Sequence, residues 1–375
     1  MRSERGFVLA MTLWLLAGIA VVVGLMTWWA LAEVRAATEE RERVDDAAAM
    51  LRARETLLYL AATREFTQGG LSVEGIDEVR RAIALLEEFG RLRKEPIGDE
   101  LRVDGTQYAW GDTRFALQDE AGLFSLVRPT PVQFDRFLEA HDIPAGSIPG
   151  LRDAFLDYID SDSLSRLAGA ENAHYRQAGR RAPPQRRLLA PTELQSVLGW
   201  DRLPEATLRS IIERSTPYYA GAINLNALPA TLLPSLIAGC PEACERFVQQ
   251  RRIRPFANAR DAQLRASVGL PGDDAIDYLA APSDSFRITL WGRTGVGWRL
   301  HVRLTPLADK AGPWTVLAAY PIPRPLDDAP APLPESALLA DAAPGGREGG
   351  APPAGRAPRT DRGGGAARGA PLPAP

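Results

Sequence analysis

A long apolar segment near the N-terminus constrains this chain more than any other feature of its sequence. Residues 7–32 contain no charged side chain. Such a run is long enough to cross the ~30 Å hydrocarbon core of a bilayer as a tilted helix. Arg2 and Arg5 precede the segment. Trp28 and Trp29 fall near its end, where an interfacial aromatic pair is expected. The pattern predicts a single-pass helix with a cytoplasmic N-terminus, and an exported remainder.

A secretory signal peptide is the first alternative for this segment. Ala30-Leu31-Ala32 supplies a small-x-small cleavage site. Signal peptides, however, have a shorter apolar region, of about 7–15 residues. The length of the segment therefore favours a helix that is kept.

The start of the segment gives a third interpretation. A short basic leader ends in Gly6, and Phe7 opens the apolar helix, which resembles the type IV prepilin signal. The resemblance implies that a prepilin peptidase cuts between Gly6 and Phe7, and that Phe7 is then N-methylated. Most pilins and pseudopilins carry a glutamate five residues into the mature chain, whereas this sequence has Met11 there. A buried glutamate needs a positive partner, so a subunit with Met11 lacks that pairing.

Helical patterning continues beyond the membrane segment. Residues 33–66 contain no Pro or Gly, and their apolar residues recur at spacings of three, four and seven. Joined to the apolar segment, they predict one helix of about 60 residues. A shorter helix is predicted over 74–91.

Alternating apolar and polar residues then predict a small antiparallel sheet. Residues 106–126 have the pattern of a hairpin with a turn at Gly111-Asp112, followed by a third strand near 123–127. Strand patterns return at 284–307 and 312–322, and we expect these strands to join the first sheet. The predicted fold class is α+β.

The residues between these strand patterns are expected to form an inserted all-α domain, SAM-like or helix-hairpin-helix in type. Short helical patterns are separated by Pro and Gly, and several have Pro in the first turn, where its missing N–H is not needed. The predicted helices cover 131–141, 149–159, 191–198, 204–213, 227–237 and 242–252, with Asn226 as the N-cap of the fifth.

These patterns divide the chain into six parts. They are a leader (1–6), a transmembrane helix (7–32), the first part of a pilin-like α+β unit (33–129), the inserted helical domain (130–282), the last strands (283–322) and a tail (323–375). Pro, Ala, Gly and Arg dominate the tail. It is predicted to be disordered, because it has too few large apolar residues to offset the entropy of ordering.

Carboxylates within residues 157–171 are candidate metal ligands. Asp160, Asp162 and Glu171 occupy positions 1, 3 and 12 of a twelve-residue loop, as in an EF-hand. Leu164 and Ser165 stand where that motif needs a ligand and a glycine, so the loop is not an EF-hand. Oxygen ligands suit Ca²⁺, and solvated or capping charges are the alternative.

Residues 223–252 predict two helices joined by a turn, the helix-hairpin-helix arrangement of some DNA-binding proteins. The turn has one glycine and continues with Pro241 and Glu242, whereas phosphate binding uses free backbone N–H groups. The net charge of −3 also argues against a nucleic-acid partner. This turn lets Cys240 and Cys244 approach each other, and in an exported domain the pair favours a disulfide, with free thiols as the alternative.

The sequence gives no support for catalysis. Its three histidines, His141, His174 and His301, lie in unrelated contexts. The chain has no Gly-x-Ser-x-Gly, His-Glu-x-x-His or P-loop motif. We therefore expect no enzymatic activity.

Several blocks of the sequence, taken in order, resemble the K minor pseudopilin of type II secretion (general secretion pathway protein K). They are the Gly6-Phe7 leader with Met11, QDEAGLFSL (118–126), LRDAFLDYIDSDSLSRLAGAENAHY (151–175), RLLAPTELQSVLGWD (187–201), and INLNALPATLLPSL (223–236) leading to VQQRRIRPFANARD (248–261). The chain departs from the family at Ser125, where asparagine is usual.

The resemblance implies a structural role. The K subunit caps a periplasmic pseudopilus together with the I and J minor pseudopilins, and it is the pseudopilin expected to lack the glutamate that Met11 replaces. The resemblance further implies an inner-membrane anchor, a periplasmic C-terminal domain, contacts with the inner-membrane secretion platform and the prepilin peptidase, and calcium in the globular part. A membrane-anchored periplasmic DNA-binding protein of competence type is the alternative, and a periplasmic hydrolase is a more distant one.

Overall fold

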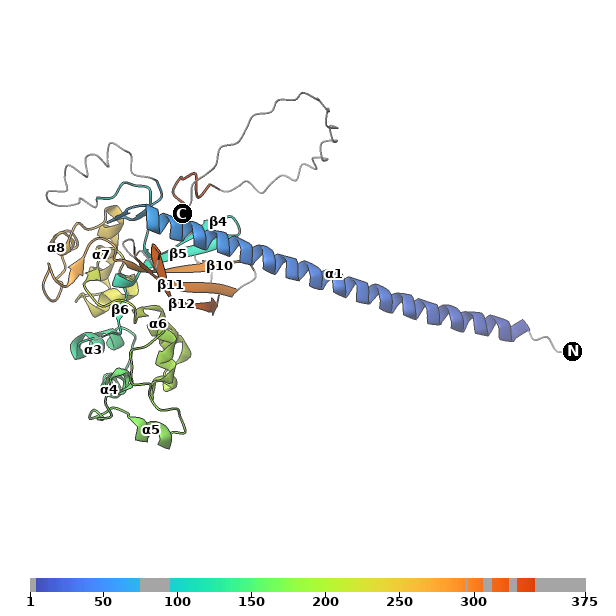
Figure 1. Ribbon diagram of the computed structural model, residues 1–375, viewed down its shortest axis with the longest axis horizontal. Helices are drawn as coiled ribbons and strands as arrows, with labels where there is room; N and C mark the ends of the chain where they lie inside the picture. Colours follow the sequence, from blue (N-terminus) through green and yellow to red (C-terminus); the bar gives the residue numbers. More distant parts are fainter. Residues whose placement is uncertain are drawn as a thin grey trace, which may run out of the picture. The chain divides into compact units, whose positions relative to one another are not determined.

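The computed structural model describes residues 5–74, 95–127, 129–293, 296–305, 312–323 and 329–340. The helix predicted over 74–91 lies, after its first residue, outside the described residues. Within them, the chain combines helices with mainly antiparallel strands in an α+β fold (Figure 1).

The N-terminal helix α1 runs from Arg5 to Thr63 without a break (Figure 1). Its 59 residues agree with the predicted length. The large apolar side chains between residues 9 and 31 are exposed, and by length and composition the helix can cross a membrane. The C-terminal part instead buries Ala53, Leu57 and Leu60. One end of α1 is therefore apolar all round, and the other packs on the protein with a single face.

A three-stranded antiparallel sheet follows α1. It consists of β1 (Phe66–Thr67), β2 (Gly70–Ser72) and β3 (Glu100–Leu101). Gly70 has a φ of 140°, and a Cβ there would lie 2.1 Å from the carbonyl oxygen of Leu101, so this close strand contact requires glycine.

The main sheet has five antiparallel strands in the order β12-β11-β10-β5-β4. Its strands are β4 (Asp104–Trp110), β5 (Thr113–Asp119), β10 (Ser285–Trp291), β11 (Val296–Leu304) and β12 (Trp314–Pro323). β10 pairs with β5, so the late strands join the first hairpin as the sequence predicts. Leu117, Ile288 and Leu300 lie opposite one another on the three central strands, in a core shared with α1.

The chain between β5 and β10 forms a mostly helical block with a core of its own. Its helices are α3 (Pro131–Glu139), α4 (Ile148–Ile159), α5 (Asn172–Gln177), α6 (Glu205–Glu213), α7 (Glu242–Ile253) and α8 (Ala259–Ala266), with 3-10 turns η1 (Glu120–Gly122), η2 (Pro191–Ser196), η3 (Trp200–Arg202) and η4 (Ala230–Ser235). The ring of Phe134 lies 5.1 Å from that of Phe155 and 6.1 Å from that of Trp200. The indole N–H of Trp200 donates to the carbonyl oxygen of Leu151 (2.9 Å), so this buried ring leaves no donor unpaired.

The block also contains short strands, so the prediction of an all-α domain is only partly right. β6 (Phe124–Ser125) pairs in parallel with β7 (Ser215–Thr216), and β8 (Ile223–Asn224) pairs in parallel with β9 (Tyr278–Leu279). The third strand predicted near 123–127 is therefore β6, which pairs with β7 and does not extend the main sheet.

Two segments predicted as α-helices are 3-10 turns, namely η2 and η4. Asn226 is not the N-cap of η4, which starts at Ala230. Its amide instead donates to the carbonyl oxygens of Phe256 (2.9 Å) and Ala280 (2.7 Å). Pro234 lies inside η4 and lacks the N–H that a continuing α-helix would use.

Part of the predicted disordered tail has a defined structure, which corrects the boundary at 323. The Ala331 N–H donates to the carbonyl oxygen of Gln107 (2.8 Å) on β4, one of the two edge strands of the main sheet. Leu339 is 4% exposed in the core beside α1, and Leu333 packs against the same core. This hydrogen bond and the packing of Leu333 and Leu339 place residues 329–340 against the sheet and its core. Residues 341–375 lie outside the described part of the chain.

Candidate functional site

An acidic cluster between α4 and α5 is the candidate site for a metal ion. The last turn of α4 carries Asp157, Asp160 follows the helix, and the loop returns at Glu171, directly before α5. One carboxylate oxygen from each residue lies within 4.8 Å of the other two. Asp157 is fully buried and Glu171 is 4% exposed, so the cluster lies largely out of reach of solvent.

Glu171 is the member of this cluster that most needs a cation. Both of its carboxylate oxygens are buried and make no close hydrogen bond among the described residues, where the Asn172 N–H and the Gln185 side chain lie near enough to interact with them. Oδ1 of Asp160 is likewise buried without a close hydrogen bond to a described residue. Burial, and then the charges of Asp157 and Asp160, raise the pKa of Glu171 above its ordinary value. Buried carboxylates without close hydrogen bonds are costly, and a bound cation would recover that cost. The residues present therefore fit a hard divalent cation such as Ca²⁺.

The guanidinium of Arg166 partly neutralises the cluster. Its Nη1 lies 2.6 Å from Oδ2 of Asp160 and also contacts Oδ1 of Asp157. The backbone N–H of Arg166 donates to Oδ2 of Asp157 (3.1 Å). The loop can approach so closely because of Gly169, where a Cβ would lie 1.9 Å from the same oxygen.

Asp162, which the sequence pattern nominates as a ligand, lies outside this cluster. Its side chain is exposed, and its Oδ1 accepts a hydrogen bond from the Leu164 N–H (2.8 Å). Asp157 joins Asp160 and Glu171 instead. Comparison with an EF-hand loop misses Asp157 because it precedes the loop, whereas its spacing of three residues from Asp160 places the two side chains on one side of a helical turn.

A second set of buried polar groups ties the helical block to the sheet. Oδ2 of Asp119 accepts hydrogen bonds from Asn224 Nδ2 (2.7 Å) and Ser283 N (3.1 Å). Its Oδ1 accepts hydrogen bonds from Ser283 Oγ (2.6 Å) and Ala121 N (3.1 Å). Burial outweighs these bonds and raises the pKa of Asp119 to about 6. One carboxylate thus connects the end of β5, strand β8 and the segment that leads into β10.

Gln118 and Gly122, on either side of Asp119, meet the same backbone carbonyl. Gln118 Nε2 donates to the oxygen of Ala227 (2.8 Å). A Cβ on Gly122 would lie 2.3 Å from that oxygen and 2.6 Å from its carbon. The QDEAG stretch of the sequence therefore forms the contact between sheet and helical block, and this contact requires a glycine.

Buried hydrogen bonds to a histidine extend this junction, and burial lowers the pKa of that histidine, His301. Oε1 of Glu120 lies 2.6 Å from Nδ1 of His301 on β11, and Nε2 of the same ring lies 2.9 Å from the Tyr320 hydroxyl. Burial alone would raise the pKa of Glu120, but His301 and Arg287 outweigh it and hold the pKa below its ordinary value. These contacts join η1 to β11 and β12 of the main sheet, so their role is structural.

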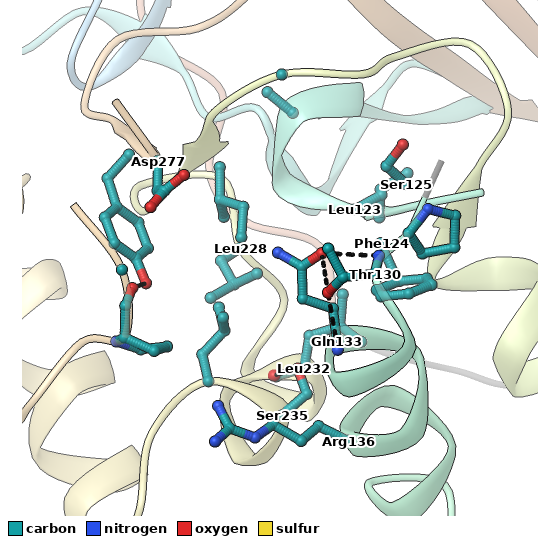
Figure 2. Close-up of a pocket in the computed structure, with 18 of the residues that line it drawn as sticks. Leu123, Phe124, Ser125, Thr130, Gln133, Arg136, Leu228, Leu232, Ser235 and Asp277 are labelled. Atoms are coloured by element: carbon teal, nitrogen blue, oxygen red, sulfur yellow. Dashed lines mark hydrogen bonds between the residues drawn. The ribbon is translucent and has the colours of Figure 1, made fainter. Parts of the chain in front are cut away.

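A cavity of about 470 Å³ lies between β6, α3 and η4 (Figure 2). Phe124, Leu228 and Leu232 line it, with Arg136 and Asp277 among its polar residues. Gln133 is fixed beside it, because its Oε1 accepts hydrogen bonds from the backbone N–H (3.2 Å) and the hydroxyl (3.0 Å) of Thr130. None of the site residues predicted from the sequence lines this cavity.

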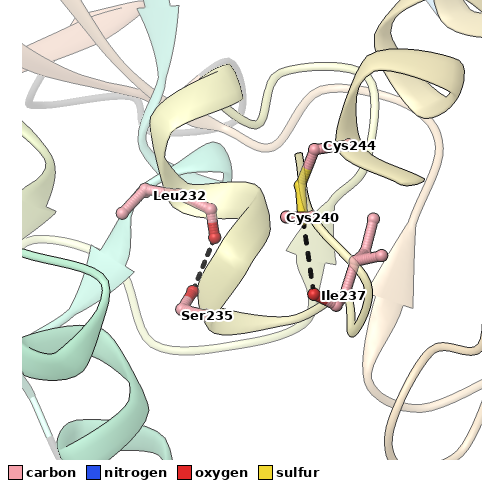
Figure 3. The surroundings of a disulfide bond; sticks show 5 residues. All are labelled: Leu232, Ser235, Ile237, Cys240 and Cys244. Carbon is pink, nitrogen blue, oxygen red and sulfur yellow. Dashed lines mark hydrogen bonds between the residues drawn. A yellow bond between two sulfur atoms is a disulfide. The ribbon is translucent and has the colours of Figure 1, made fainter. Parts of the chain in front are cut away.

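A disulfide joins the turn between η4 and α7, which holds Cys240, to the first turn of α7, which holds Cys244 (Figure 3). The Cα atoms of the two cysteines are 5.1 Å apart. Gly239 adopts a φ of 82°, which favours glycine, and Pro241 directly precedes α7. The turn is thus built for a tight chain reversal.

Gly6 and Phe7, the residues of the predicted cleavage site, belong to the first turn of α1.

Part of this chain is similar to a known protein family. A family model for protein K of the type II secretion system (T2SS) matches residues 118–212. Similarity to protein K is thus shown for this segment of the chain. The matched segment starts at the Gln118–Asp119 junction and contains the acidic cluster. Protein K is a component of the secretion apparatus, which agrees with a chain that carries a membrane-length helix.

The other comparisons are distant. No curated protein matches the chain. Among solved structures, a chain of the GspK-GspI-GspJ complex from the type 2 secretion system of enterotoxigenic Escherichia coli is similar at 16% sequence identity, with a TM-score of 0.43. The match covers 74% of this chain and 99% of that one.

Proposed function

We propose that this protein is the minor pseudopilin K at the tip of a type II secretion pseudopilus. The observation that carries the proposal is the protein K match over residues 118–212 on a chain that begins with a membrane-length helix. The role is structural, in the assembly of the apparatus that exports proteins across the outer membrane, and no enzymatic step belongs to it.

In this proposal, α1 first anchors the chain in the inner membrane. The basic residues Arg2 and Arg5 keep the N-terminus in the cytoplasm, and the sheet and helical block are periplasmic. The prepilin peptidase then removes residues 1–6 and methylates Phe7. Met11 gives the helix no carboxylate to pair with the N-terminus of a neighbouring subunit, which suits a subunit at the end of a filament.

The mature N-terminus tests this proposal. Mass spectrometry of the protein purified from membranes should find a chain that begins with N-methylated Phe7. A Gly6→Ala variant blocks the cut in this proposal and should retain the leader. A mature chain that begins at Glu33 would refute it, because the helix would then be a cleaved signal peptide.

Partners are the second part of the proposal. We expect complexes with the I and J minor pseudopilins, the counterparts of GspI and GspJ in the similar E. coli complex, and with the inner-membrane platform. Affinity purification of the tagged full-length chain from cells that express I and J should recover both. A chain that recovers neither subunit from intact pseudopili would contradict the assignment to the tip.

Calcium is the third part, bound by Asp157, Asp160 and Glu171. Titration of CaCl₂ into the detergent-solubilised, metal-stripped chain should give saturable binding that Glu171→Gln abolishes. Asp162→Asn is the matched control, because it removes an equal charge from the same loop outside the cluster. If D162N removes binding and E171Q does not, the ligand set is wrong.

A further inference from the structure

The acidic cluster already contains a positive charge, the guanidinium of Arg166, which affects how the cluster can bind a metal. Asp157 is fully buried, and the hydrogen bonds to its two oxygens from residues 160–171 come from one residue, Arg166, through its backbone N–H and its guanidinium. The guanidinium bridges to Asp160 with the same nitrogen. One side chain therefore spans two of the three carboxylates that would hold a metal.

The third carboxylate is left out of this arrangement. Glu171 is 4% exposed, and its oxygens make no close hydrogen bond in the described chain, where the Asn172 N–H and the Gln185 side chain lie near them. Oδ1 of Asp160 likewise makes no close hydrogen bond to a described residue. The arginine thus covers part of the negative charge, and the three remaining buried oxygens still call for a positive ligand.

A divalent cation and the Arg166 guanidinium cannot both contact these carboxylates without a loss of free energy. Asp157 becomes a ligand only when its contact with Nη1 is given up, and the two like charges would otherwise stand a few ångströms apart, where their repulsion is strong. The Arg166 side chain is 39% exposed, so its long stem can swing the charged end into solvent.

We infer that Arg166 is a tethered cation that competes with the metal for the cluster and substitutes for it when the metal is absent. This inference rests on the calcium site proposed above. It has two consequences. The arginine weakens calcium binding, so the site responds to high calcium concentrations. It also holds the loop of residues 160–171 on α4 without metal, so the helical block stays folded before calcium is encountered.

Calcium titrations of the full-length, detergent-solubilised chain test the first consequence. Arg166→Gln should bind calcium about tenfold more tightly or better, because wild type must release charged hydrogen bonds that the variant lacks. Arg176→Gln is the matched control. It removes the same charge from α5, where the exposed Arg176 contacts only the carbonyl oxygen of Asn172 among the hydrogen bonds of its side chain to described residues. Its affinity should stay within about twofold of wild type, because exposed charges are screened.

Thermal unfolding tests the second consequence. In EDTA, R166Q should melt below wild type, and saturating CaCl₂ should restore it. A merely structural arginine would lower the melting temperature equally with and without calcium. R176Q should follow wild type in both conditions.

The outcomes separate this inference from the site on which it rests. Tighter calcium binding by R166Q that is lost in the R166Q/E171Q double variant supports the inference. If wild type binds calcium as tightly as R166Q or more tightly, Arg166 does not compete with the metal, and the calcium site itself is still supported. If neither wild type nor R166Q binds calcium, the metal site and the inference both fall.

Discussion

Gly122 offers the most direct test of how the helical block is attached to the sheet. In Gly122→Ala, the new Cβ would lie 2.3 Å from the oxygen and 2.6 Å from the carbon of the Ala227 carbonyl. Both are backbone atoms, so the neighbour cannot turn aside as a flexible side chain would. The β8–η4 connection must move away from η1, and the hydrogen bond from Gln118 to the same carbonyl is strained or lost.

The magnitude follows from these two effects. Overpacking of a dense contact costs about 1–3 kcal/mol. Leaving a buried amide donor unpaired costs about 1–3 kcal/mol more. We therefore expect G122A to lower the free energy of unfolding by about 2–6 kcal/mol, a large part of the stability of a typical domain.

Urea unfolding of the detergent-solubilised chain, followed by tryptophan fluorescence, measures this loss. Gly150→Ala is the matched control, because nothing lies within 4 Å of a Cβ at that position in α4. G150A should be neutral or gain up to about 1 kcal/mol from better helix propensity. Equal unfolding midpoints and slopes for G122A and wild type would refute the contact between Gly122 and Ala227.

Three further predictions concern the junction, the tail and the acidic cluster. Because burial raises the native pKa of Asp119 to about 6, its favourable contribution is complete below its unfolded pKa and is lost as pH rises through 6. Relative to D119N, the free energy of unfolding of wild type should fall by up to ~3 kcal/mol between pH 4 and pH 7, measured by urea titrations at each pH. A difference in unfolding free energy between wild type and D119N that does not change with pH would contradict the raised pKa of Asp119. Leu339→Ala should cost about 2–4 kcal/mol in the same assay and Leu338→Ala, 39% exposed, much less, and equal losses would place 329–340 off the core. Gly169→Ala should weaken calcium binding in a titration, because its Cβ would collide with the Asp157 carboxylate. Gly146→Ala, which has open space around its Cβ, should bind as wild type does. Unchanged binding by G169A would contradict the close contact between Gly169 and Asp157.

Features set by local patterns can be predicted from the sequence, and these include α1 and the β4–β5 hairpin. The pairing of β10 with β5 also follows, because strand patterns on both sides of a helical stretch have one simple way to join. The 3-10 form of η4 is harder to predict, because Pro234 and the distant partners of Asn226 decide it.

The candidate site shows the limit of pattern matching. Asp160 and Glu171 are identified because they fit part of a known loop, and Asp162 is included for the same reason. Asp157 enters the cluster through the end of a helix, and Arg166 enters by folding back across the loop. Arg166 cannot be found from a fixed spacing, because its position depends on tertiary packing, whereas Asp157 follows from its spacing of three residues from Asp160.

The hydrogen bonds of Asp119 to Ser283 join residues 164 positions apart in the chain, on either side of the helical block. This separation sets an order of events during synthesis. The β4–β5 hairpin is complete long before β10 exists, and β5 must wait with one edge unpaired, a state prone to unwanted strand addition. The helical block, rich in contacts between neighbouring elements, can form in that interval. Because the two ends of the block meet at one buried carboxylate, the folded block would bring β10 beside the free edge of β5.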